Sequence, residues 1–170
     1  MSTPLLMLFL MGGPYLIGRL RSALLRRPFD VRAAAAVGLG LLFSFTALGH
    51  FVQSDLLARM LPPWVPEREI LVWWAGVLEL SIAVGLLVPR SRRLAGWAAS
   101  LLLVAFFPLN VYAAIAHVPV GGHETGPVYL LVRAPLQAAI LFWAYRYVIR
   151  LPHASRRADE PMPEPRLDAA

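Results

Sequence analysis

Apolar residues dominate one stretch of the chain, residues 71–88, in which Ser81 and Glu79 are the only polar side chains. At a rise of about 1.5 Å per residue, a helix of this length matches a hydrocarbon core of roughly 30 Å. Pro89 and three nearby arginines end the run. The pattern predicts a membrane-spanning helix with Glu79 near the middle of the bilayer, where an unpaired charge is costly.

Three more apolar runs, at residues 33–51, 94–116 and 127–148, have a similar length. The link between residues 88 and 93 is short enough to force an antiparallel hairpin. We therefore expect an all-α fold, a transmembrane four-helix bundle over residues 33–150. Between the first two spans, Ser54 can cap a short interfacial helix, which Pro62 and Pro63 would end.

The first 32 residues form a separate hydrophobic segment and an arginine-rich linker. Residues 4–18 are apolar but are interrupted by Gly12, Gly13 and Pro14. This extra N-terminal hydrophobic helix either spans the membrane with its start outside or lies on the inner surface as an amphipathic anchor, and we favour the spanning alternative. Residues 151–170, rich in proline and mixed charges, are expected to form a disordered cytoplasmic tail.

Composition agrees with a membrane protein: 58% of the 170 residues are hydrophobic, 15% are charged, and mean hydropathy is +0.61. The net charge of +6 comes from arginines beside apolar runs, which indicates membrane topology rather than nucleic-acid binding. Arginines cluster at residues 19–32, at 90–93 and after 146. The positive-inside rule then predicts a multi-pass protein of the inner (cytoplasmic) membrane with a cytoplasmic C-terminus.

Polar residues inside the predicted spans gather at one depth. Counted inward from the outer boundary at 1.5 Å per residue, Arg133 and Asn110 lie about 9 Å deep, Glu79 about 13 Å and Gln137 about 15 Å, with His50 near the boundary. The inner half of the bundle is apolar. We expect a ligand pocket in the outer leaflet, covered by a cap of Pro62, Pro63 and Trp64.

Each pocket candidate also has a structural interpretation. Asn110 and Gln137 can hydrogen-bond across helices, and His50 can be a rim residue. Glu79 and Arg133 are expected to form a buried ion pair, with either a structural or a ligand-binding role. No metal site and no catalytic residues are predicted, and the absence of cysteine excludes disulfides and thiol chemistry.

Six short motifs follow one another along residues 33–150. They are Gly49-His50-Phe51, Pro62-Pro63-Trp64-Val65-Pro66, Gly76-Val77-Leu78-Glu79, the segment 85–97, Phe107-Pro108-Leu109-Asn110 and Arg133-Ala134-Pro135-Leu136-Gln137. In this order they resemble the DoxX-like family of integral membrane proteins. The resemblance implies a four-helix fold and an association with quinone-linked oxidoreductases or with assemblies that handle sulfur and oxidative stress.

Two functions follow as hypotheses. In the first, the protein is an accessory subunit, not an enzyme by itself, whose pocket binds a quinone or another lipid-soluble small molecule for a redox partner. In the second, it is a structural or assembly protein whose buried polar layer fixes helix packing. Membrane lipid and a redox or assembly protein are the expected partners, nucleic acid is not, and a quinone is the candidate cofactor.

Overall fold

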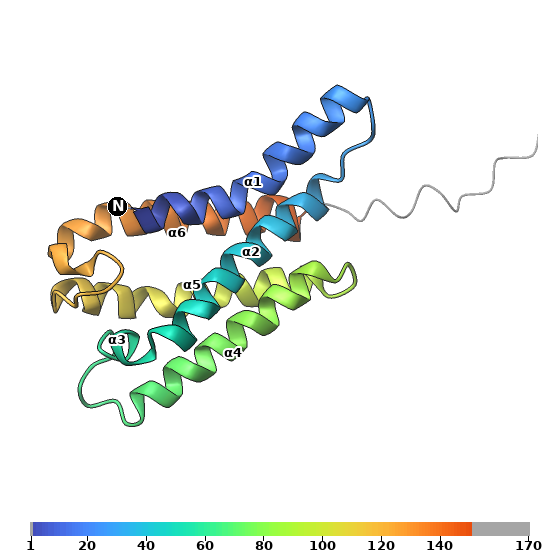
Figure 1. Ribbon diagram of the computed structural model, residues 1–170. Helices are drawn as coiled ribbons and strands as arrows, with labels where there is room; N and C mark the ends of the chain where they lie inside the picture. The colour runs from blue at the N-terminus through green and yellow to red at the C-terminus, as the bar shows by residue number, and fades with distance from the viewer. Residues whose placement is uncertain (1, 151–170) are drawn as a thin grey trace, which may run out of the picture.

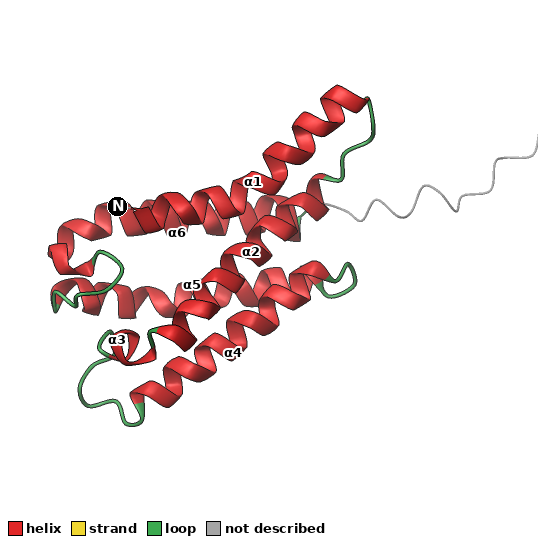
Figure 2. Ribbon diagram, in the orientation of Figure 1, coloured by secondary structure: helices red, strands yellow, loops and turns green. Residues whose placement is uncertain are grey.

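The computed structural model describes residues 2–150 and is all-helical over that range (Figures 1 and 2). The predicted tail, residues 151–170, lies outside the described residues. The helices in chain order are α1 (Ser2–Leu25), α2 (Val31–Val52), α3 (Ser54–Ala58), α4 (Arg68–Leu87), α5 (Arg92–Ile115), the 3-10 helix η1 (His123–Tyr129), α6 (Leu130–Trp143) and the π-helical turn η2 (Ala144–Ile149).

Five segments are long and apolar enough to cross a membrane: α1, α2, α4, α5, and the run from η1 through η2, which is kinked at Gly126. Their mean hydropathies lie between 1.3 and 2.1. Large apolar side chains such as Phe9, Leu101 and Leu131 are at least 68% exposed, as expected for surfaces that face lipid. The all-α prediction is confirmed, and the helices indicate a multi-pass membrane protein.

The N-terminal segment is a full-length helix of 24 residues and includes Pro14 in its interior. Its length agrees with the spanning interpretation of residues 4–18. In Figure 1 the start of α1 lies at the same end of the molecule as α3, and α1 runs alongside α6. The predicted short helix after Ser54 is present as α3.

Helix α2 is the centre of the packing, because it contacts α1, α4 and η2 and is the most buried of the five long segments. Two glycines permit close helix approach. A Cβ added at Gly38 would overlap the Met11 carbonyl of α1, and one added at Gly76 of α4 would lie 2.9 Å from His50 Cβ. Both contacts require glycine, so they fix where α1 and α4 lie against α2.

At the end of the molecule opposite α3, two arginines hydrogen-bond to backbone carbonyls at the ends of neighbouring helices. Asp30 caps α2 by accepting a hydrogen bond from the Ala33 amide at 2.8 Å. Arg32 Nε donates to the Val148 carbonyl at 3.1 Å, and Arg92 Nε donates to the Leu86 carbonyl at 3.0 Å. Cations at the C-terminal ends of helices are favourable, which explains how these two charged residues are tolerated while almost fully buried.

At the α3 end, a small apolar cluster packs beneath the connections. Ala113, Val118 and Val120 are buried there, and Leu56, Leu57 and Met60 from α3 and the residues after it pack against them. Gly126, inside η1, has a φ of 76° and kinks the last long helical segment near its start. The cluster joins α3 and the residue Met60 after it to the end of α5 and the loop that follows α5.

The arginine distribution predicts which end is cytoplasmic, and the cysteine-free chain allows a direct test. Ser91 lies in the α4–α5 hairpin and Thr125 lies in the connection to α6 at the opposite end. In intact cells, a cysteine replacing Thr125 should react with a membrane-impermeant maleimide and one replacing Ser91 should not. A cysteine at Thr3 should react as well if α1 spans. The reverse pattern for the first two positions would invert the topology.

Candidate functional site

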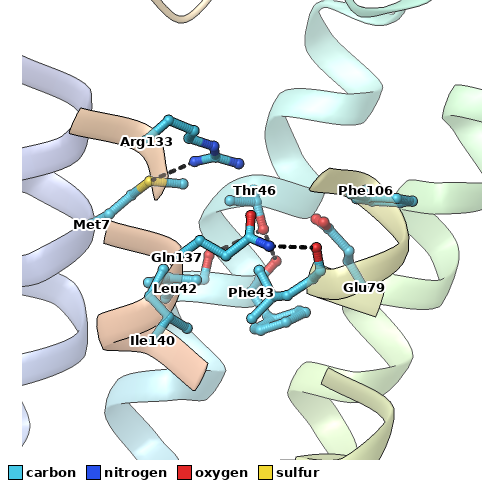
Figure 3. Close-up of a pocket in the computed structure, with 10 residues that line it drawn as sticks. Met7, Leu42, Phe43, Thr46, Glu79, Phe106, Arg133, Gln137 and Ile140 are labelled. Atoms are coloured by element: carbon cyan, nitrogen blue, oxygen red, sulfur yellow. Dashed lines mark hydrogen bonds between the residues drawn. The ribbon is translucent and has the colours of Figure 1, made fainter. Parts of the chain in front are cut away.

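A small polar cavity lies among the helices, and all five long helical segments contribute to its wall (Figure 3). Its volume is about 30 Å³. Arg133 and Glu79 reach toward it from α6 and α4, and Thr46 and Gln137 lie between them in this view. The apolar part of the wall consists of Met7 from α1, Leu42 and Phe43 from α2, Leu103 and Phe106 from α5, and Ile140 from α6.

Glu79 is 5% exposed and lies next to His50 of α2. His50 Nδ1 is 3.4 Å from Glu79 Oε2 and 2.9 Å from the Thr46 carbonyl oxygen. A carbonyl oxygen can only accept a hydrogen bond, so His50 Nδ1 carries a proton and donates a hydrogen bond to the Thr46 carbonyl. The contact between His50 Nδ1 and Glu79 is longer and electrostatic. Glu79 Oε2 is therefore buried without a hydrogen-bond donor.

Arg133 is held by neutral groups. Its Nε donates to Asn110 Oδ1 at 3.1 Å, and its terminal nitrogen lies 3.9 Å from the Met7 sulfur. Asn110 Nδ2 in turn donates to the Phe106 carbonyl at 2.8 Å, so the amide oxygen is oriented toward the guanidinium. This chain of contacts positions a positive charge on the cavity wall without a carboxylate in direct contact.

Gln137 joins α6 to α5 through its amide nitrogen, which donates to the Leu103 carbonyl at 2.9 Å. Its Oε1 is buried and has no hydrogen-bond partner. Buried polar atoms without partners are rare in folded proteins, and each one needs an explanation. Here the side chains that carry two such atoms, Glu79 and Gln137, line the same cavity.

The predicted direct ion pair between Glu79 and Arg133 is not formed among the residues that the structure describes. That prediction was wrong because Gly76, one helical turn before Glu79, faces His50 and Phe51 of α2 and not α6. The α4 face that carries Glu79 therefore packs against α2. Glu79 and Arg133 still line one cavity, and their charges attract each other across it.

The five predicted pocket residues do meet in one region, although not all of them line the cavity. Glu79, Arg133 and Gln137 line it, whereas His50 and Asn110 contact its wall residues from behind. The proposed cap is elsewhere: none of Pro62, Pro63 and Trp64 lines the cavity, and Trp64 is 81% exposed. No cluster of metal-ligating side chains occurs within the described range.

Seven of the ten wall residues did not appear among the predicted pocket residues, and Thr46 and Met7 are the most informative of these. Thr46 lies one turn before His50 on α2, and its hydroxyl donates to the carbonyls of Leu42 and Phe43. Its spacing from His50 was a usable signal. Met7 had no such signal, because an apolar residue in an apolar run carries no information about which neighbour it meets.

The cavity has room for one or two water molecules as it stands, since a water needs about 10–15 Å³ of such volume. Water or a small polar group there could donate to Glu79 Oε2 and Gln137 Oε1 and accept from Arg133. The wall thus presents an anion, a cation and a neutral acceptor to one occupant. This combination can bind a group that both donates and accepts hydrogen bonds.

We expect double-mutant cycles to give a larger coupling free energy for two side chains in direct contact than for two side chains on opposite sides of the cavity. Arg133→Met combined with Asn110→Leu should show a coupling of roughly 1–2 kcal/mol, because the two side chains are hydrogen-bonded. Glu79→Gln combined with Arg133→Met should couple by less than about 1 kcal/mol, because the cavity separates the two groups. Unfolding in detergent, followed by circular dichroism, measures each value.

Ser81→Ala is the matched control on α4. The Ser81 side chain is exposed and its hydroxyl donates within its own helix, to the Val77 carbonyl, so its loss should change stability by less than about 0.5 kcal/mol. A Glu79–Arg133 coupling larger than the Arg133–Asn110 coupling would contradict the contacts described here.

Comparison with known proteins gives one match. The model of a family described as a domain of unknown function, DUF8561, matches residues 39–148, which is more than half of the chain. No curated protein and no solved structure matches. This match overturns the resemblance to the DoxX-like proteins, so no functional association can rest on that resemblance. The chain belongs to the DUF8561 family.

Proposed function

We propose that this protein is a membrane-embedded accessory subunit that binds the polar head of a lipid-soluble small molecule, with a quinone as the leading candidate. One observation carries the proposal: Glu79, Arg133 and Gln137 line a single cavity, and Glu79 Oε2 and Gln137 Oε1 are buried without a hydrogen-bond donor. Intramembrane ionisable residues that face one another across a cavity are typical of ligand or ion sites.

The chemistry of the wall suits both redox states of a quinone. A quinone carbonyl can accept a hydrogen bond from Arg133, and a quinol hydroxyl can donate one to Glu79 or Gln137. His50 lies next to Glu79, and its Nδ1–H points its positive end toward that carboxyl group. The chain contains no cysteine, so electrons would come from the ligand and a partner protein rather than from thiols.

The proposal includes an arrangement in the membrane. We take α2, α4, α5 and the segment from η1 to η2 as a transmembrane four-helix bundle in the inner membrane, with α1 as a fifth span and α3 at the interface. The arginine-rich end is placed in the cytoplasm, together with the C-terminus. The cavity then belongs to the outer half, where the predicted depths of Glu79 and Arg133 had placed a polar layer.

A structural role is the second candidate, and two observations favour it. The cavity of about 30 Å³ holds water without any change in the fold. Two interhelical hydrogen bonds, Gln137 to Leu103 and Arg133 to Asn110, join α6 to α5, as expected of groups that fix helix packing. In this case the polar layer would be complete once one or two waters bridge Glu79 and Arg133.

Extraction in mild detergent followed by lipid mass spectrometry tests the proposal. We expect a quinone to co-purify at near one molecule per chain. Arg133→Met should lower quinone retention by about tenfold or more, because a hydrogen bond from a charged donor is lost. Asn110→Ala should have a smaller effect in the same direction, since Asn110 only orients the guanidinium.

Ser81→Ala, prepared in parallel, should retain as much quinone as the unmodified protein, because Ser81 lies away from the cavity on an exposed face. A folded protein that carries no quinone, and that shows no binding of added ubiquinone-2, would favour the structural role. Equal retention by the Arg133 variant would place any bound quinone outside this cavity.

A further inference from the structure

The outer half of α1 covers one side of the cavity with a single side chain. Met7 lines the cavity and is 7% exposed, whereas its neighbours Leu5 and Phe9 are 68% and 71% exposed. Met7 is the residue that α1 contributes to the cavity wall. Methionine is unbranched and flexible, so it fills an irregular gap without locking its surroundings.

Directly below Met7, residues 12–14 form a weak point in α1, which we call the hinge. Pro14 has no amide hydrogen, so the Leu10 carbonyl lacks its usual helical donor. Gly12 and Gly13 precede it, and a Cβ added at either position would meet nothing within 4 Å. These two glycines are therefore not required for packing, unlike Gly38, and together with Pro14 they weaken the helix at one point.

Different contacts hold the two sides of this hinge. Below it, Tyr15 contacts the rings of Phe29, Trp143 and Tyr147, with centroid distances of 5.6, 5.5 and 5.9 Å. At the hinge itself, the Met11 carbonyl rests against Gly38 of α2. Above it, Met7 is buried and its sulfur lies 3.9 Å from an Arg133 nitrogen. Its neighbours Leu5 and Phe9 are exposed, so Met7 is the buried side chain that a movement of the outer half would displace.

We infer that residues 3–10 of α1 swing about Gly12, Gly13 and Pro14, so that the cavity opens sideways to the lipid and Met7 acts as its plug. The closed volume of about 30 Å³ excludes a six-membered ring, so a ligand of that size needs an opening. Leu5 and Phe9, which flank Met7 on α1, are exposed on the surface that faces lipid, so an opening at this helix leads into hydrocarbon. The occupant is then a molecule dissolved in the bilayer; this identity rests on the function proposed above, whereas the opening does not.

A cysteine in the cavity wall reports the opening without any ligand. Thr46→Cys is nearly isosteric and introduces the only thiol of the chain. N-ethylmaleimide is larger than the closed cavity and partitions into lipid, so its reaction rate in reconstituted vesicles measures the open fraction. Stiffening the hinge by Gly12→Ala, Gly13→Ala and Pro14→Ala together should slow labelling by about tenfold, and Gly13→Ala alone should slow it less.

Removing the plug should have the opposite effect. Met7→Ala should speed labelling by about tenfold, because the entrance then stays open without movement of the helix. Gly49→Ala is the matched control: it too adds a methyl group where nothing lies within 4 Å, but in α2 and away from the hinge, and it should leave the rate unchanged. Helical circular dichroism of each variant checks folding.

Three results would overturn the inference. They are an unchanged labelling rate in both hinge variants, absence of labelling even with Met7→Ala, and labelling by a charged, lipid-insoluble methanethiosulfonate reagent as fast as by the maleimide. The last result would mean entry from water. If the hinge and Met7 variants change the labelling rate as expected but the protein binds no ubiquinone-2, the proposed function is contradicted and the movement of α1 is not. If the protein binds ubiquinone-2 but these variants leave the labelling rate unchanged, the movement of α1 is contradicted and the proposed function is not.

Discussion

The burial of two opposite charges that do not touch is the constraint on which the rest of the site depends. Glu79 and Arg133 line one cavity, and each relies on neutral or titratable neighbours, His50 for the carboxylate and Asn110 for the guanidinium. An uncompensated charge in this environment costs several kcal/mol. The neighbouring helices therefore place polar groups beside each of these two charges, namely carbonyls, amides and the thioether of Met7.

The sequence predicts one layer for the polar residues, and they do meet in one region, but the rotation of each helix about its axis was not predictable. A rise of 1.5 Å per residue is sufficient to place His50, Glu79, Asn110, Arg133 and Gln137 in one layer. Pairing within the layer depends on which face of α4 meets which neighbour. Gly76 decides this, because it packs against His50 and Phe51, and a glycine in a sequence does not indicate which helix it will approach.

The family resemblance was wrong, and the predicted cap residues are not part of the cavity wall, for a related reason. Prolines, tryptophans and glycines between apolar runs are features that many membrane bundles share, because loops at the headgroup level need helix breakers and amphipathic rings. They predicted α3 and the length of the spans correctly. They did not identify the wall of the cavity, which is closed by Met7, a residue from the segment with the least distinctive sequence.

The family match divides the site in an informative way. All the charged and amide residues of the cavity lie within residues 39–148, whereas α1 lies before them. The matched region therefore contains the groups that would recognise a polar head, and the segment outside it contributes the apolar side chain that covers them. On the proposed function, recognition would belong to the matched region, and on the inferred movement of α1, access would belong to the segment before it. Because α1 adds no polar group to the wall, it can change how fast the cavity is reached without changing what the cavity binds.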